Sequence, residues 1–346
     1  MQRRRLLAGM TAAAAAVGTP LLGTGAAEAD EVLLGELLTA RLRDAMLGLG
    51  TATTALSPGA LATDVTHAVA DFDACRYASL AVRLPRVIRA GHTLTAADGT
   101  RSGYRLLARS YLLATRMLVK LDEQQLGWMA ADRARQAADA AQDPVQAAES
   151  ARQLAVLARR AGWHDEALSI ALSAADDRDL RNAGRAGNAL RGLLVQSAAY
   201  TAARGGDREG MRELTDEAAA IAGELDTSAT PPSDHAAFGP LTVRLHRISA
   251  ENHAGDPLAA LDAARTIPLR ALPSIERRSR ALSDIAHTYH RLGRRTDCLR
   301  TLLAAEHCAP EEARTRPATR ALIAELLVSG STTTDLRGLA GRSGLL

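Results

Sequence analysis

A few side chains in this sequence have a type and spacing that could carry chemistry. His287 and His290 stand three residues apart, so they would share one face of a helix. A metal ion would need further ligands, and the sequence supplies no complete ligand set around this pair. Asp165 and Glu166 are adjacent, and neighbouring helix positions diverge by about 100°. This pair therefore indicates the acidic, solvated start of a helix rather than a catalytic pair.

The sequence motifs of common enzyme classes are absent. The chain contains no G-x-G-x-x-G, no Walker A loop, no G-x-S-x-G and no H-E-x-x-H. Its three cysteines, Cys75, Cys298 and Cys308, form no C-x-x-C motif, and their odd number indicates buried thiols rather than a disulfide framework. We therefore expect no enzyme activity, no cofactor and no bound metal.

Arginine is the remaining candidate for function. Lysine and arginine together number 42, and Lys120 is the only lysine. A guanidinium binds a carboxylate through two parallel hydrogen bonds, so a surface lined with arginine would attract acidic ligands. The formal net charge is only +3, for which Arg3, Arg4 and Arg5 account, and the body shows no basic stripe. We therefore expect no direct binding of nucleic acid by this chain.

The elements that must position these side chains are predicted to be helices. Alanine supplies 73 of 346 residues, whereas aromatic residues make up only 3%, which favours helices over strands. Apolar periodicity predicts helices that include 104–120, 126–141, 145–160 and 165–175. We expect loops at 48–64, 91–103 and 226–239, a break at Pro85, and partial order at best over 330–346.

The predicted helices form pairs that repeat along the chain. Three segments match the first-helix pattern W-x2-L-G-x2-Y of the tetratricopeptide repeat, in which small residues allow close helix contact. They begin at Tyr104, Ala151 and Leu282. Turn glycines at 162, 206, 255 and 293 are spaced by more than the usual 34 residues, so the repeats are degenerate. The sequence predicts an all-α fold, an α-solenoid over 31–346, with a non-repetitive helical bundle as the alternative.

The repeat register also predicts which side chains line the concave groove of such a solenoid. First-helix residues that are not used in stacking point inward. These are Arg105, Arg109, Arg152, Arg159, Arg280, Ser283, His287, His290 and Arg291. An arginine-lined groove would suit carboxylates, including the end of an acidic peptide. The alternative is that these arginines only keep an alanine-rich surface in solution.

Residues 1–30 allow two interpretations. Arg3, Arg4 and Arg5 precede an apolar, alanine-rich stretch that ends in Ala27-Glu28-Ala29, which resembles a twin-arginine export signal. The other interpretation is an alanine-rich linker. Glycine and threonine interrupt the stretch, so we do not expect a stable membrane span.

In combination, several ordered segments resemble the C-terminal sensor half of actinobacterial XRE-type helix-turn-helix transcriptional regulators. The segments are 72–77 (FDACRY), 84–85 (LP), 126–134 (LGWMAADRA), 140 (A), 143–144 (DP), 238–240 (FGP), 245–247 (LHR), 272–278 (LPSIERR), 309–312 (APEE) and 316–317 (RP). The resemblance spans roughly 31–342. It adds His246 and Arg247 to the ligand-site candidates, because both lie within one of these segments.

The resemblance implies a sensor rather than an enzyme. Such regulators carry a DNA-binding domain ahead of the repeats, and the sequence holds none, so either translation starts upstream or this is a stand-alone sensor. The family also has an alanine-rich connector at this place, which favours the linker interpretation of 1–30 and a cytoplasmic location over export. We expect a peptide or protein partner or a small ligand in the groove, with a homodimer as a further expectation.

Overall fold

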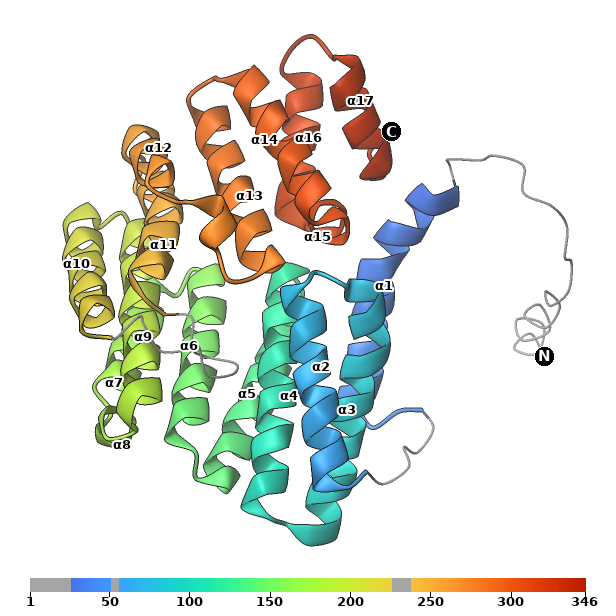
Figure 1. Ribbon diagram of the computed structural model, residues 1–346, viewed down its shortest axis with the longest axis vertical. Coiled ribbons are helices and arrows are strands. Elements are labelled where there is room, and N and C mark those ends of the chain that lie inside the picture. Colours follow the sequence, from blue (N-terminus) through green and yellow to red (C-terminus); the bar gives the residue numbers. More distant parts are fainter. Residues whose placement is uncertain (1–25, 51–55, 226–237) are drawn as a thin grey trace, which may run out of the picture.

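The structure, a computed structural model, describes residues 26–50, 56–225 and 238–346. Within these ranges the chain is helical and contains no strand, which confirms the all-α expectation (Figure 1). The α-helices are α1 (Ala26–Met46), α2 (Pro58–Asp73), α3 (Tyr77–Asp98), α4 (Arg101–Lys120), α5 (Gln124–Ala141), α6 (Pro144–Arg160), α7 (His164–Ala175), α8 (Arg178–Arg181), α9 (Gly184–Gly205), α10 (Arg208–Glu224), α11 (Pro240–His253), α12 (Pro257–Arg265), α13 (Ile275–Arg291), α14 (Arg295–Cys308), α15 (Pro310–Thr315), α16 (Pro317–Val328) and α17 (Thr334–Arg342). A short 3₁₀ helix, η1, spans Leu269–Ala271.

Most helices pack against their neighbours in sequence, and five consecutive pairs recur: α4 with α5, α6 with α7, α9 with α10, α11 with α12, and α13 with α14. The turn inside each pair holds a residue with positive φ, from 65° to 88°. These residues are Asp122, Gly162, Gly206, Gly255 and Gly293. Glycine adopts this left-handed conformation without a steric penalty. The four glycines that the sequence predicts as repeat turns therefore do lie inside pairs.

Small residues allow neighbouring helix pairs to approach one another. The buried face of α5 consists of alanine, with Gly127 at its start. A Cβ atom added at Gly127 would lie 3.0 Å from a methyl group of Leu157 on α6, so any larger residue would force Leu157 to shift. At Gly192 on α9, an added Cβ would overlap the ring of Phe238. Close packing of this kind explains the abundance of alanine in the chain.

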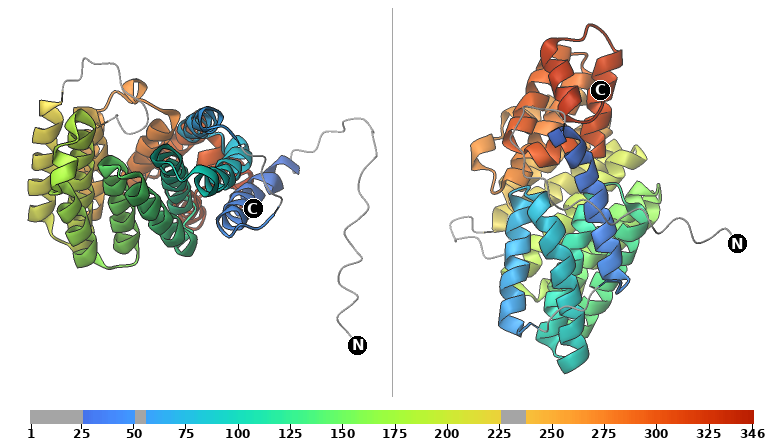
Figure 2. Two further views of the ribbon diagram at one scale, coloured as in Figure 1. Left: turned by 90° about the horizontal axis from the view of Figure 1, so that it is seen from below. Right: turned by 90° about the vertical axis from the view of Figure 1, so that its right-hand side faces the viewer.

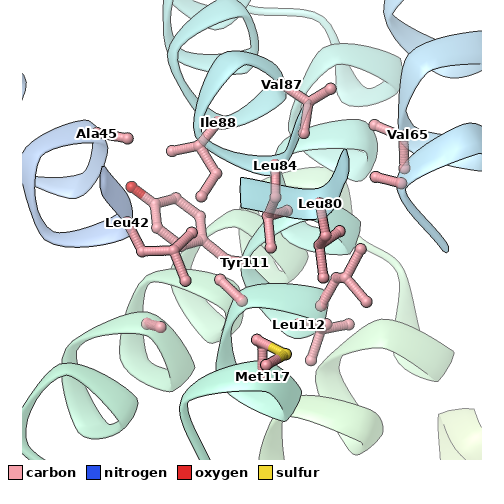
Figure 3. Packing of buried hydrophobic residues seen from close by; sticks show 14 of the residues in the cluster. Leu42, Ala45, Val65, Leu80, Leu84, Val87, Ile88, Tyr111, Leu112 and Met117 are labelled. Carbon is pink, nitrogen blue, oxygen red and sulfur yellow. The ribbon is translucent and has the colours of Figure 1, made fainter. Parts of the chain in front are cut away.

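The largest apolar core of the described residues lies in the N-terminal part and is built by helices α1 to α5 (Figure 3). Leu42 of α1, Leu84 and Ile88 of α3, and Tyr111 and Met117 of α4 point toward one another there, and all five side chains are fully buried. Each such side chain contributes about 1.5–3 kcal/mol to folding. This core fixes α4, the first helix of the first pair.

The array curls back so that its C-terminal part rests on its N-terminal part. Helix α1 contacts α15 and α2 contacts α13, and Figure 2 shows α1 (dark blue) reaching the orange helices. The ammonium group of Lys120 on α4 lies 2.8 Å from Glu276 on α13 and 2.8 Å from Glu312 on α15. The Tyr77 hydroxyl on α3 also donates a hydrogen bond to Glu312. These buried polar contacts join segments that are distant in sequence, with 192 residues between Lys120 and Glu312 and 235 between Tyr77 and Glu312.

Three local expectations from the sequence are wrong. The expected loop at 48–64 ends early, because Ser57 caps α2 and Pro58 begins it. Helix α3 runs through Pro85 and on to Asp98, so neither the break nor the first part of the expected loop at 91–103 exists. Burial of Pro85 and of its neighbours offsets the lost hydrogen bond.

The last expectation that fails concerns the C-terminal segment. Instead of being partly ordered, 330–346 contains α17, whose Leu336 and Leu339 are buried in a core with Cys298. The segment proposed as a linker or signal lies outside the described residues up to residue 25, and so does 226–237 of the expected loop at 226–239. Among the described helices, none combines the length and the hydropathy that crossing a bilayer requires.

Candidate ligand-binding groove

A cavity of about 530 Å³ lies among the first helices of the five pairs. Its lining comes from α2, α4, α6, α9, α11, α13 and the beginning of α16. None of the lining residues belongs to the second helix of a pair. The volume falls within the range of small-molecule pockets. We refer to this cavity as the groove.

The groove is strongly cationic. Its lining includes nine arginines and one lysine, against two carboxylates, those of Glu276 and Asp284. The cations are Arg116, Lys120, Arg152, Arg159, Arg160, Arg204, Arg277, Arg280, Arg291 and Arg316. The chain as a whole carries a net charge of only +3. A cleft lined by one sign of charge concentrates ligands of the opposite sign, so the groove favours anions.

Some of these cations are held by carboxylates. Arg280 Nε lies 3.2 Å from Asp284 Oδ2 on the same helix. Arg152 makes two hydrogen bonds of 2.7 Å to the carboxylate of Glu149, which lies behind it on α6. Arg291 instead donates to the backbone carbonyl of Asn252. These contacts set the orientation of the guanidinium groups.

Arg159 differs from these paired cations, because no carboxylate of the described residues pairs with it. Its side chain is buried, with 8% of the residue exposed. One nitrogen, Nη1, donates to neutral oxygens: the Ser197 carbonyl at 3.2 Å, the Ser197 hydroxyl at 3.3 Å and the Thr201 hydroxyl at 3.2 Å. The guanidinium also lies over the Tyr200 ring, 4.5 Å from its centre. Burial lowers the pKa of Arg159 to about 10.

His246 on α11 lies in the positive field of the same arginines. Burial, followed by the charges of Arg277, Arg280, Arg152 and Arg159, holds the pKa of His246 well below its usual range. The imidazole is therefore neutral at neutral pH. Its Nε2 atom is buried and has no hydrogen-bond partner in the part of the chain that the structure describes.

Three further groove side chains contain buried polar atoms without partners in the described ranges. Both amide atoms of Gln196 lack a hydrogen bond, although only 1% of this residue is exposed. The same holds for Asn252 Oδ1 and for the hydroxyl of Ser283. A buried polar atom that is left unsatisfied costs about 1–3 kcal/mol. Together with the unpaired guanidinium of Arg159, these atoms are arranged for a polar, anionic ligand.

Most of the candidates predicted from the sequence meet in this groove. The lining includes Arg152, Arg159, His246, Arg280, Ser283, His287 and Arg291. They come from α6, α11 and α13, which are distant in sequence and all border the groove.

Four predicted candidates do not line the groove. Arg105 pairs with Asp143 at 2.8 Å, and Arg109 lies only one helical turn further along α4, whereas the groove crosses α4 near its C-terminal end. His290 points the other way and lies 2.9 Å from Glu325 of α16. Arg247 is the outward neighbour of His246. The tetratricopeptide pattern identified these helices but not which part of each helix borders the groove.

Sequence reasoning missed the contributions of α9 and parts of α11 and α13. The missed residues include Gln196, Ser197, Arg204, Asn252 and Arg277. The turns would have found this region, because the residue six positions before each turn residue lines the groove in all five pairs. These residues are Arg116, Val156, Tyr200, Ser249 and His287. The glycine spacing was therefore a better guide than the side-chain pattern of the repeat.

No protein-family model, no curated protein and no solved structure matches this chain. The groove must therefore be interpreted from its own chemistry. Within the described ranges, no group of three or more histidine, cysteine or carboxylate side chains is placed to hold a metal ion.

Proposed function

We propose that this chain is a sensor or interaction module that binds an anionic small ligand or an acidic peptide in the groove, without catalysing a reaction. The observation that carries the proposal is the convergence of unpaired positive charge and unsatisfied buried polar atoms on one cavity. The proposal includes two finer assignments. The pairs form a degenerate tetratricopeptide-like α-solenoid, and the chain acts as the sensor region of an XRE-type transcriptional regulator.

The mechanism is stoichiometric. Groove residues come from helices of successive pairs, so one ligand contacts α6, α9, α11 and α13 together. A ligand shifts the balance between two arrangements of these pairs only if it binds one of them more tightly. The Glu276 carboxylate lines the groove and also holds Lys120, which joins the two ends of the array. Ligand binding can therefore change how the ends meet and, through them, contact with a partner or a second copy.

The buried cysteines support a non-catalytic role. Burial raises the pKa of Cys75 and of Cys298 to about 12, so both thiols stay protonated at neutral pH. The thiolate is the nucleophilic form, which makes these residues inert. Neither cysteine lines the groove.

A thermal-shift panel tests the proposal. The panel contains dicarboxylates, phosphate monoesters and acidic peptides, each beside a neutral counterpart of similar size and at equal ionic strength. We expect at least one anion to raise the melting temperature, because a ligand that binds only the folded state stabilises it. We also expect that anion to be recovered chemically unchanged. Equal shifts with the neutral counterparts, or no shift at all, would contradict the proposal.

The alternative is an exported scaffold with the same repeats, and it rests on the sequence of residues 1–30. N-terminal sequencing of the native protein separates the two. A mature chain that begins at Asp30 would establish export and end the proposal of a cytoplasmic regulator.

A further inference from the structure

We propose that Arg159 and Arg204 form the anion subsite of the groove, and that its ligand is a small organic molecule carrying a phosphate monoester. This inference rests on the proposed function, since it names the ligand class for the same groove. The starting observation is that three cations of the lining have no carboxylate partner among the described residues. Arg291 donates to the Asn252 carbonyl, whereas Arg159 is buried and Arg204 is exposed.

The charge of the subsite indicates a dianion. Arg159 and Arg204 are close enough for the charge of Arg204 to act on Arg159, and both line the cavity. Their two positive charges are not balanced locally, whereas Arg280 and Arg152 each have a carboxylate. A phosphate monoester places close to two negative charges and three acceptor oxygens on one group. A planar guanidinium binds such a group through two parallel hydrogen bonds.

The atoms of Arg159 that remain available support this geometry. All three of its hydrogen bonds to Ser197 and Thr201 come from Nη1. Nε and Nη2 have no acceptor in the described ranges and belong to a side chain that lines the cavity. The unsatisfied amide of Gln196, which precedes Ser197 on α9 and also lines the cavity, offers a further donor. The protein therefore holds Arg159 by one nitrogen and leaves the other two for the ligand.

The rest of the lining suits a carbon skeleton of limited size. Val119, Val156 and Leu193 contribute apolar surface from α4, α6 and α9. Ser283 and Asn252 offer a hydroxyl and an amide oxygen without partners on the opposite helices. A volume of about 530 Å³ fits a small molecule with a few hydroxyl or amide groups, rather than an extended peptide.

Isothermal titration calorimetry with the full chain at low salt and neutral pH tests the proposal. The probes are phenyl phosphate, inorganic phosphate, benzoate, a pentaglutamate peptide and a phosphoserine heptapeptide. We expect phenyl phosphate to bind more tightly than all the others, because only it offers both a dianionic group and a small apolar body. Arg159→Gln and Arg204→Gln should each weaken its binding at least about tenfold. Arg204 is exposed, so its substitution does not endanger folding.

Arg300→Gln is the matched control, since it removes the same charge from α14 at a residue whose side chain is 74% exposed and lies outside the groove. It should leave the affinity unchanged. Equal affinities of phenyl phosphate for the parent and for both groove variants would overturn the subsite. Tighter binding of the heptapeptide, or of inorganic phosphate, would overturn the small organic ligand. Binding of pentaglutamate alone, sensitive to Arg159→Gln, would refute the phosphate inference and leave the proposed function intact. If no anion binds, both fail.

Discussion

Replacing Arg159 with glutamine should weaken ligand binding at least about tenfold without destabilising the free protein. The buried guanidinium stays charged at neutral pH in both the folded and the unfolded chain, because neutral pH lies below its pKa in either state. A pKa lowered by folding means that the folded state disfavours the charge. This penalty is fully present at neutral pH and fades only when the pH rises through about 10.

The size of the effect follows from the same value. A fall of the Arg159 pKa to about 10 corresponds to a penalty of roughly 3 kcal/mol on the charged form in the folded state. The substitution also removes contacts, among them the cation–π contact with Tyr200, which is worth about 1–2 kcal/mol. The Ser197 carbonyl keeps a donor, because the Thr201 hydroxyl bonds it at 3.0 Å. The gains and losses nearly cancel, which leaves the free protein equally stable or stabilised by about 1–2 kcal/mol.

Calorimetric melting of the free parent and the variant measures this balance. We expect the melting temperature of Arg159→Gln to be unchanged or up to about 4 °C higher. Arg300→Gln controls for the loss of one positive charge. A fall of more than about 3 °C for Arg159→Gln, with no fall for the control, would show that the guanidinium serves the fold. The argument that this buried charge is kept for a ligand would then be wrong.

Three other outcomes follow from the structure. Lys120→Met should destabilise the protein by about 3–5 kcal/mol in denaturant titrations, because it leaves the buried carboxylates of Glu276 and Glu312 without their shared cation; a loss below about 1 kcal/mol would contradict this. Acidification from neutral pH to about pH 5 should lower the melting temperature, because His246 binds a proton more readily when unfolded, and His246→Gln should flatten this dependence; an equal slope in the variant would refute the assignment. Gly192→Ala should destabilise by at least about 1–3 kcal/mol in denaturant titrations, because its methyl group would overlap the aromatic ring packed there, whereas an unchanged midpoint would show that the ring can move away.

The helices could be predicted from the sequence because most of them obey local rules. Periodicity and capping residues placed the predicted helix at 145–160 within one residue of its observed bounds. The errors arose where tertiary packing outweighs a local signal. Pro85 and Gly91 both lie inside α3, and the backbone there approaches Leu107 so closely that an added Cβ at Gly91 would lie 2.9 Å from a methyl group. A single sequence does not show that a glycine serves packing rather than a loop.

The groove could be predicted in part, for a related reason. The repeat pattern predicts that Arg152, Arg159 and Arg280 face inward, since one helical face follows from spacing alone, and all three line the groove. It could not separate His287 from His290, because both lie near the edge of that face and only the position of α16 decides between them. Arg159 is unusual because its partners are neutral oxygens of α9, and the sequence of α6 gives no sign that its arginine will meet neutral oxygens rather than a carboxylate.

The contact between the N-terminal and C-terminal helices constrains how this protein can evolve. An open solenoid tolerates the gain or loss of a repeat, since each unit touches only its neighbours. Here Lys120 must meet Glu276 and Glu312, and several complete helix pairs lie between these residues in the sequence. Inserting or deleting one helix pair would move these groups out of contact and leave buried charges without partners. The ion pairs of Lys120 with Glu276 and Glu312 therefore fix the number of helix pairs, whereas the side chains that line the groove are free to vary.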